Sequence, residues 1–511
     1  MENKHYLCNR IVNQTVSNMA TFIPSKYQRA FFTFVQKGRS NAVLDAVAGS
    51  GKSTTIVKAI ALIPQDKRIL FLAFNKSIVE ELKRKIGPVP NVEIKTLHSL
   101  GASAITRSLH SAVNPDKYKA YINDGIATGA IFPYADLTSE EKGDWKQNIM
   151  TLIDLGRVNL VKTADELDEL AYKHNLILQD NEVLIAMRAI AWGVNNTSEI
   201  DFTDMIYFPC VKKITLFQYD FVFIDECQDL NAAQRTLFLR CIKKDGRFVA
   251  VGDPRQAIYG FAGADVESFN MLKNLPHTAH MPLSVCYRCD ADIIAAAKEI
   301  VPQIEAREGA PSGTIDYAAK LEDVKDGDMI LCRVTKPLVA LCMHYIASGV
   351  KAYVKGRDIG TNLVNLLKKT KRTVLAEAFE RLNKELDKIA QKVKAKTHCT
   401  DAEAKENDAY RAMADKIGAL EVLSDGCADV LELIDRIETI FSDEAGSGIC
   451  LSTVHKAKGL EADRVFIVCP DKFYLKQCMV VPWMAEQERN LVYVAITRAK
   501  HYLGYITDFA M

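Results

Sequence analysis

The stretch Ala46-Val47-Ala48-Gly49-Ser50-Gly51-Lys52-Ser53 carries the strongest signal in this chain. It follows an apolar run, 42–44, that predicts a buried strand, and it precedes residues 54–63, whose apolar side chains recur at helical spacing. A strand, a glycine-rich turn and a Lys-Ser pair that opens a helix are together typical of a phosphate-binding P-loop. Ala46 stands where the general pattern has its first glycine, so a glycine turn beside a buried lysine remains the simpler alternative.

The loop predicts specific roles for its residues. Its glycines let successive backbone N–H groups close around phosphate oxygens. Lys52 supplies a mobile positive charge for the β- and γ-phosphates, and the Ser53 hydroxyl supplies a ligand for Mg²⁺. The phosphate-binding residues that we expect are Ala48, Gly49, Ser50, Gly51, Lys52, Ser53 and Thr54.

The composition is that of an ordinary globular chain of several domains. Its 511 residues are 48% hydrophobic and 25% charged, and the net charge is +1. This nearly neutral net charge does not indicate a nucleic-acid-binding protein, although a large enzyme can contain a basic channel while its total charge is neutral. No run approaches a membrane span, and residues 1–25 lack the apolar core of a signal peptide, which predicts a cytosolic protein.

Thirteen cysteines are scattered along the chain, which fits a reduced interior. The C-x-x-C stretch Cys286-Tyr-Arg-Cys289 has no second pair to complete a tetrahedral metal site. We expect these two residues to be small thiols that line a core, with metal binding as the less favoured alternative.

Strand and helix patterns alternate in the first part of the chain, which predicts a parallel sheet covered by helices. The predicted strands are 68–74, 92–96, 220–225 and 247–252, with a helix at 76–86. Residues from about 105 to 200 interrupt this alternation and have mostly helical patterns. The apolar face expected for a helix at 181–194 consists of Leu184, Met187, Ala191 and Val194.

The second half of the chain repeats this plan. Its predicted strands are 328–334, 351–355 and 463–469. Between them, a heptad-like seam consists of Leu375, Phe379, Leu382, Leu386, Ile389 and Val393. A polar turn at 397–408 separates that seam from Tyr410, Met413, Ile417 and Leu420, which predicts a helical hairpin, and 442–448 is a flexible return to the sheet.

The run 221–229, Phe-Val-Phe-Ile-Asp-Glu-Cys-Gln-Asp, predicts a buried strand that ends in adjacent acids. Asp225 can hold Mg²⁺ directly or through water, and Glu226 can orient and deprotonate the water that attacks a γ-phosphate. Solvated acids at a strand end are the simpler alternative, but the P-loop in the same chain disfavours it.

A third strand leads into 251–261, Val-Gly-Asp-Pro-Arg-Gln-Ala-Ile-Tyr-Gly-Phe. Gln256 can contact a γ-phosphate, while Tyr259 and Phe261 offer aromatic faces a few residues further on. A nucleotide-sensing amide beside rings that stack on bases would couple the two sites, although both aromatics also suit a core.

These segments resemble the motifs of UvrD/Rep-type superfamily 1 DNA helicases, and the resemblance continues in order along the chain. Lys26-Tyr-Gln-Arg29 resembles the adenine-reading Q motif, and 72–77 and 95–101 resemble motifs that contact DNA. Segments 283–288, 452–461 and 490–500 resemble motifs IV, V and VI. The compact branch that includes the F-box DNA helicases is the most similar.

This resemblance implies an α/β fold of two RecA-like parallel-sheet domains, each with a mostly helical insertion. The first domain is expected at 1–105 and 201–280, with its insertion at 106–200. The second domain is expected at 281–360 and 446–511, with a short helical-hairpin insertion at 361–445.

The resemblance also implies roles for single residues around ATP. Gln28 would read the adenine edge, Tyr287 would stack on the adenine ring, and Glu461 would contact the ribose. Arg288 and Arg498 would reach the γ-phosphate from the second domain as arginine fingers, because a planar, permanently charged guanidinium suits the spread negative charge of phosphoryl transfer. The catalytic residues that we expect are Lys52, Glu226, Gln256, Arg288 and Arg498.

DNA is expected across the tops of both sheets. The candidate contacts are Phe74, Thr96, His98, Tyr259, Phe261 and His455. The basic cluster 368–372 is equally a contact for duplex phosphates or a solvated helix face. Phe261-Ala262 replaces the usual Trp-Arg and Cys286 the usual Asn, which affects the expected strength of coupling rather than the reaction.

The sequence therefore predicts an ATP- and Mg²⁺-dependent helicase that moves 3′ to 5′ on single-stranded DNA, with the polarity implied by the resemblance alone. Its expected partners are single-stranded DNA and single/double-strand junctions, without a membrane. The expected location is cytoplasmic, nucleoid-associated in a bacterium or virus and nuclear in a eukaryote. The alternatives are a translocase that strips proteins from single strands and an ATP-gated DNA-binding subunit with little turnover.

Overall fold

Two parallel β-sheets form the centre of the computed structural model, which describes residues 22–132, 137, 139–174, 176, 178, 181–258, 267–397, 399–442, 448–473 and 482–508. The first sheet has the order β3 (Val92–Thr96), β2 (Ile69–Ala73), β6 (Tyr219–Ile224), β7 (Ile242–Gly252), β1 (Asn41–Ala46) and β8 (Thr278–Leu283). The second has the order β11 (Thr314–Asp316), β17 (Ala499–Ile506), β16 (Ala462–Val468), β12 (Met329–Cys332), β15 (Ile449–Thr453), β13 (Ala352–Lys355) and β14 (Phe441–Ser442). These two sheets confirm the predicted α/β fold class.

Both faces of each sheet are buried, which explains why the strands read as nearly continuous apolar runs. Along β2, Leu70 and Leu72 pack into one hydrophobic cluster, while Phe71 and its alternate neighbours pack into another. Along β12, Ile330 and Leu331 likewise belong to clusters on opposite faces. Helices therefore cover both sides of each sheet.

The covering helices alternate with the strands along the chain. Around the first sheet they are α2 (Lys26–Lys37), α3 (Lys52–Ile60), α4 (Lys76–Ile86), α11 (Ala232–Arg240) and α12 (Ser268–Lys273). Around the second they are α13 (Ala291–Lys298), α14 (Thr335–Ala347) and α20 (Pro482–Ile496). In the part of the chain that the structure describes, no helix has the length and hydropathy to cross a bilayer.

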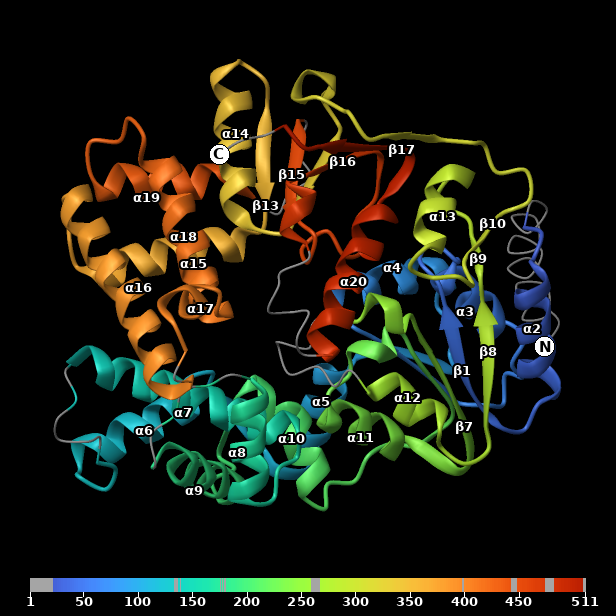
Figure 1. Ribbon diagram of the computed structural model, residues 1–511. Coiled ribbons are helices and arrows are strands. Elements are labelled where there is room, and N and C mark those ends of the chain that lie inside the picture. The colour runs from blue at the N-terminus through green and yellow to red at the C-terminus, as the bar shows by residue number, and fades with distance from the viewer. Residues whose placement is uncertain are drawn as a thin grey trace.

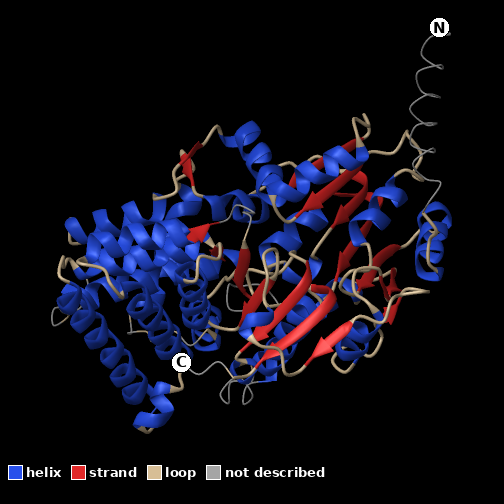
Figure 2. Cartoon of the chain, turned by 90° about the horizontal axis from the view of Figure 1, so that it is seen from above, coloured by secondary structure: helices blue, strands red, loops and turns tan. Residues whose placement is uncertain are grey.

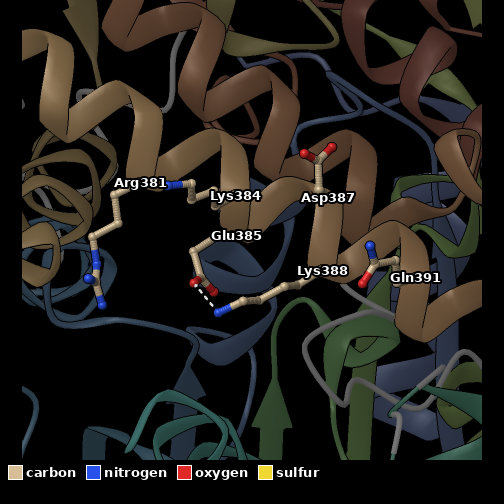
Figure 3. A pocket seen from close by; sticks show the side chains of 6 residues that line it. All are labelled: Arg381, Lys384, Glu385, Asp387, Lys388 and Gln391. Carbon is tan, nitrogen blue, oxygen red and sulfur yellow. Dashed lines mark hydrogen bonds and ion pairs between the residues drawn. The ribbon is translucent and has the colours of Figure 1, made fainter. Parts of the chain in front are cut away.

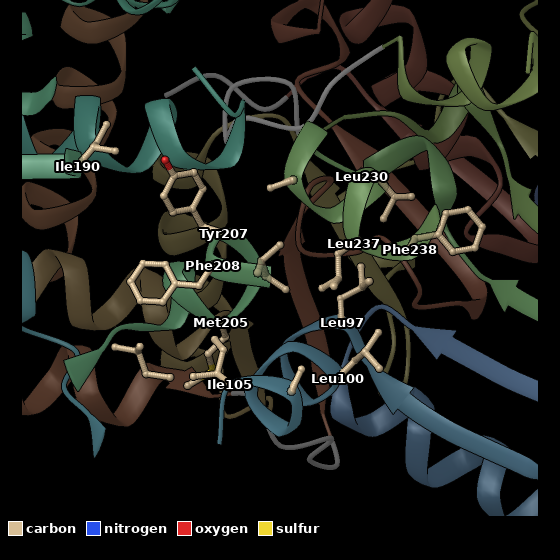
Figure 4. Packing of buried hydrophobic residues seen from close by; sticks show 14 of the residues in the cluster. Leu97, Leu100, Ile105, Ile190, Met205, Tyr207, Phe208, Leu230, Leu237 and Phe238 are labelled. Carbon is tan, nitrogen blue, oxygen red and sulfur yellow. The ribbon is translucent and has the colours of Figure 1, made fainter. Parts of the chain in front are cut away.

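A first group of helices lies between β3 and β6 in the chain and packs against the first sheet (Figure 1). Its members are α5 (Leu97–Leu109), α6 (Lys117–Ala127), α7 (Ser139–Val158), α8 (Ala164–Lys173), α9 (Glu182–Asn195) and α10 (Phe202–Val211). Figure 4 shows Leu100 of α5, Phe208 of α10 and Leu237 of α11 in one buried cluster. Helices α5 and α10 approach closely because residue 101 is glycine: a Cβ there would lie 1.8 Å from the Met205 carbonyl oxygen.

The apolar face predicted for α9 was partly wrong, although the helix itself is confirmed. Met187 and Val194 pack against the buried cluster, but Leu184 and Ala191 are exposed. Leu184 is 54% exposed, whereas Ile185, Ala189 and Ile190 are buried against the rest of the helical group. Gly193 completes the buried face, since a Cβ there would lie 2.0 Å from the Tyr118 hydroxyl oxygen. Gly193, which has no side chain to block Tyr118, therefore lies on the buried face of α9, whereas the large Leu184 lies on the exposed face.

A second group of helices lies between β13 and β14 and is seen beside the second sheet in Figure 1. Its members are α15 (Arg357–Thr370), α16 (Leu375–Thr397), α17 (Asp401–Lys405), α18 (Asp408–Ser424) and α19 (Val430–Ile440). The predicted seam is confirmed, because Leu382 and Val393 are buried and α16 packs on α18. The stretch predicted as a plain turn contains α17, capped by the Thr400 side chain. Within the predicted flexible return, 443–447 lie outside the described residues.

The two helical groups meet away from the sheets. Figure 2 shows helices gathered on one side of the molecule and most strands on the other. Lys392 of α16 forms an ion pair with Asp144 of α7, with 2.7 Å between Nζ and Oδ2. A pocket on α16 is lined by Arg381, Lys384, Glu385, Asp387, Lys388 and Gln391 (Figure 3). Its mixed charges make this face of α16 polar.

Helices α6, α7 and α10 are joined by a buried ionic cluster. The Arg157 side chain is inaccessible to solvent and donates to Asp201 at 2.8 Å, Asp204 at 2.9 Å and Asp154 at 2.7 Å. Lys117 donates to Asp204 at 2.8 Å, and its side chain is also buried. Two cations thus neutralise carboxylates that would otherwise be buried and unpaired.

Replacing Arg157 by Ala should lower the free energy of unfolding of the first helical group by about 3–5 kcal/mol, because Asp201 loses its cation and Asp204 keeps only Lys117. Trp145 and Trp192 lie in this group, so urea unfolding followed by tryptophan fluorescence reports on it. The matched control is Arg188→Ala, at an exposed position on α9, which should change the midpoint little. Equal midpoints for the two variants would contradict a stabilising role for the cluster.

Candidate nucleotide site

The P-loop joins β1 to α3 at the carboxyl edge of the first sheet. Gly49 and Gly51 adopt positive φ values of +67° and +74°, which non-glycine residues rarely adopt, and α3 begins at Lys52. The Ser50 hydroxyl oxygen is buried and, among the described residues, has no hydrogen-bond partner. A loop with positive-φ glycines, an unpaired hydroxyl and a helix N-terminus fits a phosphate group.

Lys52 and Glu226 form a partly buried ion pair, with 2.9 Å between Nζ and Oε1. Burial acts to lower the pKa of Lys52, but the charges of Glu226, Asp225 and Asp253 outweigh it and raise that pKa. Burial acts to raise the pKa of Glu226, but Lys52 and Lys458 lower it to about 2. The lysine is therefore charged and the glutamate ionised.

Asp225 lies at the end of β6 and accepts a hydrogen bond from the Glu226 N–H at 2.9 Å. Burial, together with the charge of Glu226, raises the pKa of Asp225 to about 6. A buried carboxylate beside a second carboxylate favours a divalent cation, and Mg²⁺ prefers oxygen ligands with phosphate among them. Asp225 and the half-buried Ser53 therefore suit Mg²⁺ held between protein and nucleotide.

Gln28 and Tyr287 meet beside α3, as the resemblance implied. The Tyr287 hydroxyl lies 3.3 Å from Gln28 Oε1, and Gln28 Nε2 donates to Thr55 Oγ1 at 2.9 Å. A Cβ on Gly51 would lie within 4 Å of both side chains. Gln28 is buried, whereas Tyr287 is 38% exposed, which leaves ring surface available for stacking.

Arg288 and Glu461 also come together. Arg288 Nε donates to Glu461 Oε2 at 2.6 Å, and its Nη1 donates to the Thr497 carbonyl at 3.2 Å. A Cβ on Gly49 would lie 2.8 Å from the Arg288 Cβ and 2.7 Å from the Cys286 sulfur. The segment before Arg288 therefore rests directly on the P-loop.

Arg498 is almost fully buried, between α20 and β17. Its guanidinium donates to the carbonyls of Val494 at 2.9 Å and Leu460 at 3.1 Å, and to the Thr497 hydroxyl at 3.2 Å. Burial and the charge of Arg288 lower its pKa to about 10. Because these acceptors are neutral, they do not cancel the positive charge of Arg498, and that charge can attract an anionic ligand.

Several residues that the sequence reasoning did not select complete the site. The Tyr493 hydroxyl accepts from the Ala48 N–H at 2.8 Å and donates to Asp253 Oδ2, 3.2 Å away. Gln256 Nε2 donates to the same Asp253 oxygen at 2.8 Å. Lys458 of the second domain forms an ion pair with Asp229 of the first domain. Tyr493 and Lys458 lie inside the recognised motifs VI and V, so their position in those motifs was the available signal.

The predicted DNA contacts that the structure describes lie at carboxyl ends of strands. Phe74 follows β2 and is 47% exposed, Thr96 caps α5 after β3, and His98 is exposed beside it. His455 follows β15; burial and the charges of Arg333, Lys456 and Lys458 lower its pKa to about 3, so its ring is neutral at physiological pH. Tyr259 and Phe261 lie outside the described residues.

Two further sequence features, the C-x-x-C stretch at 286–289 and the basic cluster at 368–372, lie in the described part of the chain. Cys286 and Cys289 are fully buried in a hydrophobic cluster, as expected for core thiols. Among the residues that the structure describes, no three His, Cys, Asp or Glu side chains gather to hold a metal ion. Lys368, Lys369, Lys371 and Arg372 are exposed at the end of α15, which fits either interpretation of that cluster.

A P-loop faced by arginines from a second parallel sheet defines a two-domain P-loop protein of the RecA-like type. Residues 27–277 match the family model of the UvrD/REP helicase N-terminal domain, and residues 350–508 match that of the UvrD-like helicase C-terminal domain. The chain belongs to the UvrD/Rep family of DNA helicases.

Individual relatives are distant in sequence. The chain is 24% identical to F-box DNA helicase 1 of Gallus gallus over 93% of this chain and 48% of the relative. It is 23% identical to F-box DNA helicase protein 1 of Schizosaccharomyces pombe over 90% of this chain and 54% of the relative. It is 23% identical to the ATP-dependent DNA helicase PcrA of Staphylococcus epidermidis over 50% of this chain and 37% of the relative. The chain spans about half the length of the two F-box relatives.

Replacing Gly49 by Ala should separate the P-loop from the 286–288 segment, because the new methyl group would overlap the Cys286 sulfur and the Arg288 Cβ. The expected result is faster amide hydrogen exchange at 46–50 and 286–289. Gly87→Ala is the matched control, since Gly87 also has a positive φ, +74° against +67° for Gly49, but nothing within 4 Å of an added Cβ. Unchanged exchange in Gly49→Ala would show that the two segments are not held in contact.

Proposed function

We propose that this protein is an ATP-driven, Mg²⁺-dependent translocase and helicase that moves 3′ to 5′ along single-stranded DNA. The observation that carries the proposal is the convergence on one P-loop of Lys52, Glu226 and Gln256 from the first domain and Arg288 and Arg498 from the second. The relatives named as DNA helicases support DNA as the track. The polarity rests on the resemblance to the family alone.

ATP binding would change the partner of Lys52. The phosphates attract Lys52 away from Glu226, which loses the charge that lowers its pKa to about 2 and becomes a stronger base. Glu226 then accepts a proton from the water that attacks the γ-phosphate, and Gln256 helps to orient that water or the phosphate. Mg²⁺ held by Ser53 and Asp225 supplies positive charge to the phosphate oxygens when it is bound.

The arginines make hydrolysis depend on closure of the two domains. Arg498 is positioned by backbone carbonyls of its own domain, and Arg288 exchanges Glu461 for phosphate oxygens. Both guanidinium groups stabilise the charge that spreads over the transferred phosphoryl group. Repeated closing and opening moves the two DNA-binding edges relative to each other along the strand.

Single-stranded DNA is proposed to cross the carboxyl edges of both sheets. Phe74 is exposed enough to stack on a base, and the Thr96 segment presents the N-terminus of α5 to a phosphate. The neutral His455 can donate a hydrogen bond or stack but adds no positive charge. The preferred partners are single-stranded DNA and its junctions with duplex.

The proposal is tested by ATP hydrolysis with and without single-stranded DNA, and by strand displacement on 3′-tailed and 5′-tailed duplexes. We expect DNA to stimulate hydrolysis and displacement to require a 3′ tail. Stimulated hydrolysis without displacement would indicate the translocase that strips proteins from single strands. Displacement on the 5′ tail alone would overturn the polarity, and absence of hydrolysis would overturn the motor itself.

Replacing Arg498 by Ala should lower kcat by about 10³-fold or more and change ATP affinity only a few-fold, because an arginine finger acts mainly in the transition state. Steady-state hydrolysis and binding of a fluorescent ATP analogue measure the two effects separately. Arg188→Ala, on the exposed surface of α9, is the control that should leave both unchanged. A variant that loses affinity but keeps its maximal rate would make Arg498 a ground-state binding residue.

A further inference from the structure

One face of α20 is hydrogen-bonded to the loop that follows β7. Gln487 Nε2 donates to the Ile258 carbonyl at 2.8 Å, and Asn490 Nδ2 donates to the Ala257 carbonyl at 3.1 Å. Tyr493 stands on the same face, three residues further along the helix. These side chains are hydrogen-bonded to the backbone of the first domain. Helix α20 therefore fixes the position of the Asp253–Gln256 segment relative to the second domain.

Tyr493 differs from its two neighbours because its hydroxyl bonds two separate parts of the first domain. It accepts the Ala48 N–H of the P-loop at 2.8 Å and donates to Asp253 Oδ2 at 3.2 Å. The residue is fully buried, so no water replaces either bond. Burial and the charge of Asp253 hold the Tyr493 pKa well above its ordinary value, which keeps the proton needed for donation.

The bonds continue from Asp253 to the proposed catalytic groups. Gln256 donates to the same carboxylate oxygen as Tyr493, at 2.8 Å. The Asp253 N–H donates to Gln228 Oε1 at 3.1 Å, and Gln228 Nε2 donates to Glu226 Oε2 at 2.6 Å. An unbroken series of hydrogen bonds therefore leads from α20 of the second domain to Glu226 beside Lys52.

We propose that the Tyr493 hydroxyl is a positioning group that aligns the P-loop, Gln256 and Glu226 when the second domain closes. Closure places the hydroxyl between Ala48 and Asp253, and opening removes it and leaves both groups without that partner. The inference rests on the proposed ATP hydrolysis, because it assigns to Tyr493 the alignment of the groups that carry it out. Tyr493 acts through Asp253 and does not contact the phosphate itself.

Tyr493→Phe tests the proposal because it removes the hydroxyl and keeps the ring. We expect DNA-stimulated kcat to fall about tenfold, the effect of losing one buried hydrogen bond, with KM for ATP within about twofold. Amide exchange of 46–51 should become faster, because the Ala48 N–H loses its acceptor. The matched control is Tyr502→Phe, which removes a hydroxyl bonded to Asp316 at 2.9 Å in the second sheet.

The control separates alignment from general stability. Both variants should remain folded at the assay temperature, as their melting temperatures will show, while Tyr502→Phe keeps the wild-type kcat. Unchanged kcat in Tyr493→Phe, or equal losses of kcat in both variants, would overturn the positioning role. If the wild-type protein hydrolyses no ATP, the proposed function fails, and unchanged exchange at 46–51 would then separately overturn the contact.

A double-mutant cycle with Asp253→Asn tests whether the hydroxyl acts through Asp253. In the Asp253→Asn background, Tyr493→Phe should lower kcat by less than about twofold, because the acceptor that passes the alignment to Gln256 is already changed. A further full tenfold loss in that background would show that Tyr493 acts independently of Asp253 and would overturn the proposed series of bonds.

Discussion

The second domain supplies hydrogen-bond partners for the backbone of the P-loop, and the arrangement of the site depends on this contact. The Gly49 carbonyl accepts from the Tyr287 N–H at 2.8 Å, and the Ala48 N–H donates to the Tyr493 hydroxyl at the same distance. Buried backbone groups require partners, so separating the domains without water or ligand in their place is costly. The phosphate-binding loop is therefore formed by one sheet and completed by the other.

Charge adds a second constraint on the same cleft. Lys52 balances Glu226, and Lys458 reaches from the second domain to Asp229 of the first. Burial raises the pKa of Asp229 to about 6 in spite of that lysine. Burial and the charge of Glu226 also raise the pKa of Asp225 to about 6. A bound Mg²⁺ would offset the charge of these buried carboxylates together with that of the phosphates.

The sequence predicted the strands and the P-loop well because each depends on local pattern. Apolar runs become strands buried on both faces, and the glycines of the P-loop become the positive-φ positions. It was wrong for half of the apolar face of α9, because Leu184 and Ala191 are exposed. The close approach of Tyr118 to Gly193 determines which side of that helix is buried. Tyr493 was missed for a related reason: its partners, Ala48 and Asp253, are distant in sequence, and no spacing rule brings them together.

In the proposed motor, the same distance in sequence allows the site to distinguish open from closed states. Lys52 and Glu226 lie in one domain and remain paired whether or not the cleft closes. Arg288 and Tyr493 contact the P-loop from the second domain, so these contacts are lost when the domains separate. If DNA favours the closed arrangement, it raises the rate of hydrolysis without contacting ATP, because it increases the fraction of molecules in which these groups are aligned.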